Sequence, residues 1–168
     1  MKALIAIATR KTTRDFKRDQ ITETELDTIL GAGSSAPAAL GDYGNIHFTV
    51  VENSGLLLRL SGESKKKPLY GAPTLVLISA KPTPYPNIEF FNTACVIENM
   101  LIAATALGLG SAIISGASEE ANGNPGLLAE LGLPESYFPV GAVALGYPAK
   151  PLGEKTDFKR TVKINRID

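Results

Sequence analysis

The feature that most constrains the fold is a long apolar segment in the middle of the chain, from Phe91 to Leu107. Its hydrophobic side chains recur at helical spacing, and Gly108 and Gly110 directly after it are typical of a helix end. Small and apolar residues also fill most of its other positions, which predicts a helix buried on most sides. Such a helix needs other elements packed around it, so we expect it to be the central element of the core.

Helices and strands are mixed along the rest of the chain. Thr22 and Glu25 form a capping-box pattern, which predicts the start of a helix that ends at Gly31 and Gly33. Periodicity and turn residues predict further short helices over 2–8, 56–60 and 125–131, strands over 46–52, 74–79 and 140–148, and a loop over 122–125. The regular alternation of a doubly wound fold is missing. We therefore expect an α+β fold with one sheet between helices, formed as a single domain over residues 1–168.

Composition and charge limit the classes of function. The 17 Lys and Arg residues balance 17 Asp and Glu residues, so no overall positive field indicates a nucleic-acid partner. The single histidine, His47, and the single cysteine, Cys95, are too few for a zinc site or a hydrolytic triad, and we expect both to be packed residues. The apolar runs are too short for a membrane span, and no signal-peptide cleavage pattern follows the first of them, so we expect a cytoplasmic protein. Difficult chemistry would therefore have to come from an organic cofactor.

The basic segment of residues 10–14 is the strongest candidate for a binding site. Arg10 and Arg14 offer forked hydrogen-bond donors, Lys11 adds positive charge, and the hydroxyls of Thr12 and Thr13 can donate to phosphate oxygens. If the segment is extended, residues 10, 12 and 14 point to one side and converge on one anion. The pattern by itself also fits a solvated basic surface, because short basic runs are common. The lysine run 65–67 has the same two interpretations.

Taken in order, the segments of the chain resemble those of the FMN-dependent nitroreductase family. The family's opening motif Arg-x-Ser-x-Arg-x-Phe is similar to Arg10-Lys11-Thr12-Thr13-Arg14-Asp15-Phe16, with Thr12 in place of serine. Further similar segments are 36–38, 47–51, 70–73, 99–111 and 139–148, so the resemblance covers nearly the whole chain. Each motif alone is weak, and their order and spacing together are specific. The resemblance implies a three-layer α/β/α sandwich with a mixed, largely antiparallel sheet.

The resemblance also implies a homodimer that binds FMN at the subunit interface. Four groups of residues would bind it: Arg10, Lys11, Thr12 and Arg14 at the phosphate and ribityl chain, Pro37, Ala38 and Ala39 from the partner subunit, Ser115 and Gly116 near flavin N5, and Lys159 and Arg160 as a second basic pair at the phosphate. No side chain is expected to be catalytic, because flavin N5 would carry the chemistry, and no metal is expected. The chain departs from the family where Ala38 replaces a serine and where residues 41–45 replace an Asn-x-Gln-Pro-Trp pattern.

The activity that the resemblance implies is that of an NAD(P)H-dependent flavin oxidoreductase. NADH or NADPH would deliver hydride to FMN, and a small-molecule acceptor such as a nitro compound, a quinone or an unsaturated carbonyl would then take the electrons in the same pocket, in a ping-pong scheme. The proline-rich segment 81–86, with Tyr85, is a candidate wall of the acceptor pocket. The alternatives are a flavin enzyme of different chemistry (dehalogenation or flavin fragmentation), a non-catalytic FMN-binding module, and an α+β protein without a cofactor.

Overall fold

The central sheet has four antiparallel strands in the order β1-β2-β4-β3 in the computed structural model, which describes residues 2–62, 68–153 and 162–167. The strands are β1 (Ile46–Val51), β2 (Thr74–Ala80), β3 (Gly110–Ile113) and β4 (Phe138–Gly146). In the registers of the central pairs, Val76 lies opposite Val50 on one side and Val143 on the other. Every residue of β2 is buried, as expected for a central strand with helices on both faces.

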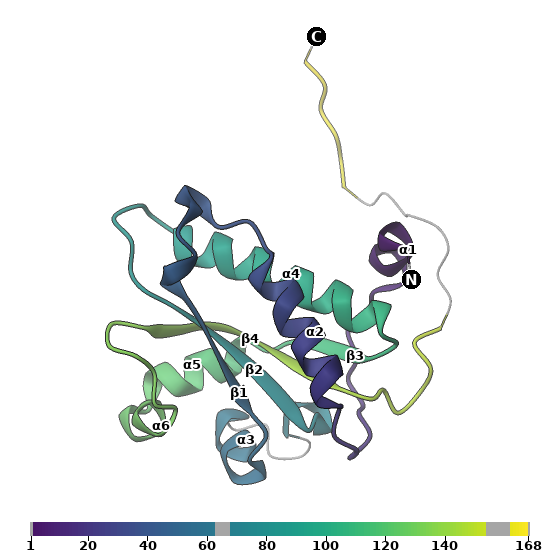
Figure 1. Ribbon diagram of the computed structural model, residues 1–168, viewed down its shortest axis with the longest axis horizontal. Helices are drawn as coiled ribbons and strands as arrows, with labels where there is room; N and C mark the ends of the chain where they lie inside the picture. Colours follow the sequence, from purple (N-terminus) through teal and green to yellow (C-terminus); the bar gives the residue numbers. More distant parts are fainter. Residues whose placement is uncertain (1, 63–67, 154–161, 168) are drawn as a thin grey trace.

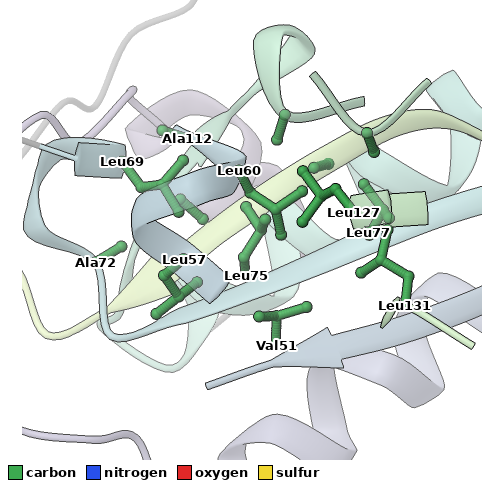
Figure 2. Close-up of a cluster of buried hydrophobic side chains, with 14 of the residues drawn as sticks. Val51, Leu57, Leu60, Leu69, Ala72, Leu75, Leu77, Ala112, Leu127 and Leu131 are labelled. Carbon is green, nitrogen blue, oxygen red and sulfur yellow. The ribbon is translucent and has the colours of Figure 1, made fainter. Parts of the chain in front are cut away.

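Helices cover both faces of this sheet (Figure 1). The helices are α1 (Ala3–Thr9), α2 (Glu23–Ser34), α3 (Ser54–Leu60), α4 (Ile88–Ala106), α5 (Ser115–Gly123) and α6 (Pro125–Glu130), with short 3-10 turns η1 (Ala39–Gly41), η2 (Tyr43–Asn45) and η3 (Pro68–Gly71). Because strand side chains alternate between the faces, Val76 and Ile78 pack with α2 and α4, while Leu75 and Leu77 pack with α3, α5 and α6. Figure 2 shows the cluster around Leu75 and Leu77, in which leucines of α3 and α6 contact β2. The predicted three-layer α/β/α sandwich is confirmed.

The central helix α4 confirms the strongest sequence prediction, although it begins three residues earlier, at Ile88. It ends at Ala106, one residue before the predicted Leu107, and Gly108 follows with a φ of +78°, the left-handed conformation that glycine adopts most easily. The N–H groups of Gly108 and Leu109 donate to the carbonyls of Thr105 (3.0 Å) and Ala104 (2.8 Å), which is a Schellman motif. No helix in the described part of the chain is long and apolar enough to cross a membrane.

Two predictions about helix ends are wrong. Helix α2 has the predicted capping box but continues through Gly31 and Gly33 to Ser34. A Cβ atom on Gly33 would lie 2.5 Å from Met100 Cε, so glycine serves here to let α2 and α4 approach closely. Residues 122 and 123, expected in a loop, end the helix α5, which was not predicted because its buried side chains are only small ones, with Ala117 and Ala121 the apolar pair among them.

Candidate functional site

The basic segment of residues 10–14 lies in extended conformation beside the edge strand β3. The Thr13 N–H donates to the Ser111 carbonyl at 2.8 Å, and Thr12 forms a parallel bridge with Ser111. This bridge supplies the parallel element of the predicted mixed sheet, since the four strands pair only antiparallel in the described residues. The close approach requires Gly110, because a Cβ atom there would lie 2.8 Å from Thr13 Oγ1.

The other side of the segment pairs with the turn that follows β4. Phe16 forms an antiparallel bridge with Pro148, and the Asp15 carbonyl accepts a hydrogen bond of 2.9 Å from the Ala149 N–H. Held from both sides, the segment buries Thr13 and Phe16 and exposes Thr12 and Arg14. Lys11 and Asp15 are exposed as well, so exposure does not alternate along the segment as expected for an extended chain with one binding side.

A hollow of about 240 Å³ lies between the basic segment and the turn after β4. Its lining residues are Lys11, Thr12, Thr13, Arg14, Asp15, Pro148, Lys150, Pro151 and Leu152. Three of these side chains are cationic and one is acidic, which leaves an excess of two positive charges. Exposed guanidinium, ammonium and hydroxyl donors around one hollow suit a phosphate group. Sequence reasoning missed Lys150, because only the folded chain brings it next to the N-terminal segment.

Arg10 lies outside the lining of this hollow. Its Nε atom is 3.5 Å from Glu98 Oε1 on α4, and both side chains are partly exposed, at 33% and 50%. An exposed pair of this kind contributes about 0.2–1 kcal/mol, so it holds Arg10 only weakly in this position. The predicted second pair, Lys159 and Arg160, lies outside the described residues. It follows Gly153, where a Cβ atom would lie 3.0 Å from Lys11 Nζ.

Strand β3 connects this cationic hollow to the second predicted group, Ser115 and Gly116. The four residue steps from Ser111 to Ser115 span about 13 Å at the usual rise of about 3.3 Å per residue. Gly116 lies in the first turn of α5, where backbone N–H groups have no partner within the helix and no side chain caps them. A Cβ atom built on Gly116 meets nothing within 4 Å, so the space beside it is open.

A second hollow of about 170 Å³, lined by uncharged residues, adjoins Gly116. Its lining residues are Leu60, Ser61, Leu69, Tyr70, Ile114, Gly116 and Ala117. Leu69 and Tyr70 have positive φ angles of +47° and +60°, a strained conformation that is often found at ligand sites. Apolar walls beside the first turn of a helix suit a ring system. The residues of α3 that form one wall carried no local sequence signal for this role. The lysine run 65–67 lies outside the described residues.

Within one chain, the predicted loop Pro37 to Ala39 does not lie beside the cationic hollow. The Ala39 N–H donates to Asn92 Oδ1 at 2.8 Å, near the start of α4. Figure 1 shows this loop at the end of α4 that lies away from α1 and the basic segment. A single chain therefore holds the loop and the cationic hollow apart.

The proline-rich segment 81–86 is tied to the first turn of α4. The Thr83 N–H donates to Glu89 Oε1 at 2.5 Å. Hydrogen bonds from the backbone N–H groups of Glu89 itself and of Thr83 hold the pKa of the Glu89 carboxyl below its ordinary value. Tyr85, Phe90 and Phe91 beside this bond are exposed at 53%, 58% and 65%, so this end of α4 presents an aromatic surface.

The fold is an α+β sandwich in which β3 runs between a cationic hollow and a second hollow with apolar walls. The model of the nitroreductase family matches residues 57–147. A relative from Methanothermobacter thermautotrophicus, provisionally named NADH dehydrogenase/NAD(P)H nitroreductase, is 30% identical over 165 residues, which cover 94% of this chain and 83% of that protein. The chain belongs to the nitroreductase family, and the resemblance seen in the sequence is confirmed.

Solved structures agree with this membership. A nitroreductase with bound FMN from Bacteroides fragilis has a TM-score of 0.80 and 32% identity, and the match covers 99% of this chain and all of that one (100%). A nitroreductase with bound FMN from Desulfitobacterium hafniense has a TM-score of 0.83 at 21% identity, with 100% of both chains covered. The second likeness supports the fold alone, and the first supports the closer relationship.

Proposed function

We propose that this chain is an NAD(P)H-dependent FMN oxidoreductase that reduces small-molecule acceptors, such as nitro compounds or quinones, in a ping-pong scheme. The observation that carries the proposal is the connection, through β3, of a cationic hollow to an open amide beside an apolar hollow. The residues fit FMN, because the phosphate needs the first feature and the ring system needs the second. The FMN bound in the Bacteroides fragilis relative supports this cofactor, and the name of the Methanothermobacter thermautotrophicus relative, which contains NADH and NAD(P)H, supports this donor.

Each part of the site has a role in this scheme. Lys11, Thr12 and Arg14 bind the phosphate, with Lys150 beside them and Arg10, Lys159 and Arg160 as further cations. Bound FMN supplies hydride and electron transfer. The Gly116 N–H at the start of α5 would serve as the donor to flavin N5, and the positive end of the helix would stabilise negative charge on the ring. The scheme requires no nucleophilic side chain.

We propose a homodimer with FMN at the subunit interface, in which the partner's loop Pro37 to Ala39 completes each site. Two observations support it. The loop is remote from the cationic hollow of its own chain, and α1, η1 and α4 expose large apolar side chains, among them Leu4 at 66%, Leu40 at 70% and Phe91 at 65%. Residues 1–168 would then form one FMN-binding unit, consistent with the 99% coverage by the Bacteroides fragilis structure. A cytoplasmic location stays a prediction from the sequence.

The test starts with the absorption spectrum of the purified protein after incubation with FMN. A colourless protein that takes up no FMN would refute the proposal. Anaerobic addition of NADH and NADPH, each followed by nitroaromatic and quinone acceptors, should bleach the flavin and then restore its colour. Flavin that is reduced but passes electrons to none of these acceptors would favour dehalogenation or flavin fragmentation. Bound FMN that neither nicotinamide reduces above background would favour a non-catalytic module.

A further inference from the structure

The segment of residues 37–45, which we call the interface loop, is held by side chains from two other elements. At its first end the Ala39 N–H donates to Asn92 Oδ1 of α4 at 2.8 Å. At its second end the hydroxyl of Tyr137, directly before β4, donates to the Gly44 carbonyl. The Lys81 N–H also donates to the Asn45 carbonyl at 3.0 Å, where the loop enters β1. The loop is therefore fastened from both sides.

Both anchoring side chains are themselves fixed. Asn92 is only 6% exposed, so its amide cannot turn freely into solvent. The ring of Tyr137 meets the ring of His47 edge to face, with centroids 5.6 Å apart, and Lys81 Nζ lies 5.0 Å from the centre of the Tyr137 ring. These contacts fix the direction of the Tyr137 hydroxyl.

Between the anchors the backbone is strained. Leu40 has a φ of +64°, which is unfavourable for a residue with a branched side chain, and Gly41 follows at +66°. The Leu40 side chain is nevertheless 70% exposed, so packing within its own chain does not repay the strain. Residues held in a strained conformation by their surroundings are typical of ligand-binding sites.

We propose that Asn92 and Tyr137 are positioning residues of the flavin site, which hold the interface loop in the shape that contacts FMN bound by the partner subunit. The inference rests on the proposed homodimer and FMN site. Both side chains contact the loop through its backbone atoms, so we assign them a positioning role and not a catalytic one. Releasing one anchor lowers the fraction of loops in the binding shape, and the apparent affinity for FMN falls by that fraction.

The Tyr137→Phe variant tests the second anchor, since it removes one hydroxyl and keeps the ring contacts. Tyr147→Phe is the matched control, because the Tyr147 hydroxyl donates to Glu25 Oε2 at 2.8 Å, remote from the interface loop. We expect Tyr137→Phe to speed hydrogen exchange in a peptide spanning the loop and to raise the Kd for FMN by about three- to tenfold. The control should lower the melting temperature comparably and leave loop exchange and the FMN Kd within about twofold.

The Asn92 anchor is tested by two substitutions of similar size. Asn92→Asp keeps an acceptor oxygen and should keep FMN affinity near that of the wild type, whereas Asn92→Leu lacks the acceptor and should lose about tenfold or more. If Asn92→Leu fails to fold, Tyr137→Phe decides alone. Faster loop exchange with an unchanged FMN Kd would overturn the positioning role and leave the proposed function intact. A wild-type protein that binds no FMN would overturn both, and this is measured first.

Discussion

The clearest test of the cationic hollow is the Arg14→Ala variant. Arg14 is exposed and lines the hollow, and within the described residues it has no ion pair, so its guanidinium can form charge-assisted hydrogen bonds with a phosphate. Such bonds contribute about 1.5–3 kcal/mol, which predicts a rise in the FMN Kd of about 10- to 150-fold. The assay is a titration of the apoprotein that follows the quenching of flavin fluorescence.

Riboflavin, which lacks the phosphate, separates this effect from a general loss of structure. Arg14→Ala should leave riboflavin affinity within about twofold, because the lost contact is made only by the phosphate. Arg18→Ala, which removes the same charge from a residue outside the hollow, is the matched control and should leave FMN affinity unchanged. An equal loss of affinity for FMN and riboflavin, or no loss for either, would refute the assignment of the hollow to the phosphate.

Three further predictions follow from the structure. Glu98→Gln frees Arg10 from its ion pair, so it should strengthen FMN binding by up to about 1 kcal/mol in the same titration, and weaker binding would contradict this. Gly110→Ala forces a Cβ atom against the basic segment and should cost about 1–3 kcal/mol of stability by denaturant unfolding, with weaker FMN binding; an unchanged unfolding midpoint would show that the segment moves freely. The backbone hydrogen bond from Thr22 lowers the pKa of Glu25 below its ordinary 4.5, so its contribution is present above that pH and is lost as pH falls through the lowered pKa. The melting temperature should therefore fall less steeply below about pH 4.5 in Glu25→Gln than in the wild type, and parallel curves would count against this linkage.

Much of the fold was predictable because regularly spaced apolar side chains indicate its main helix and strands. The segment that became α4 and the strand that became β2 carry large side chains at regular spacing, and the structure places them in the core. Helix α5 escaped prediction because Ala117 and Ala121 leave no visible apolar stripe. The start of α2 was predictable because the capping box is local in the sequence. Its end was not, because Gly33 serves the contact with Met100, which is distant in the sequence.

In the candidate site too, local features could be predicted from the sequence and contacts between distant segments could not. The cluster of cationic and hydroxyl groups over residues 11–14 could be predicted because it is local in the sequence, whereas the expected alternation of sides is not seen, since Lys11 and Asp15 are exposed together with Thr12 and Arg14. The contribution of Lys150 could not, because it comes from the turn after β4 at the far end of the chain. The pairing of Arg10 with Glu98 was equally hidden, since nothing local indicates which of several carboxylates a basic side chain will meet.

The short strand β3 fixes the distance between the cationic hollow and the first turn of α5. Backbone hydrogen bonds to β4 and to the basic segment fix the strand on both sides, so the separation between its two ends is set by covalent geometry and does not depend on side-chain packing. Removing one residue from 111–114 would shorten the separation by about 3.3 Å and turn the remaining side chains to the opposite face. Under the proposed assignment of the two hollows, FMN would have to match this fixed length between its phosphate and its ring. The length of the loops around the proposed ring site is not fixed in this way. Their sequence can therefore change, and with it the acceptor, while the residues proposed to bind the cofactor stay the same.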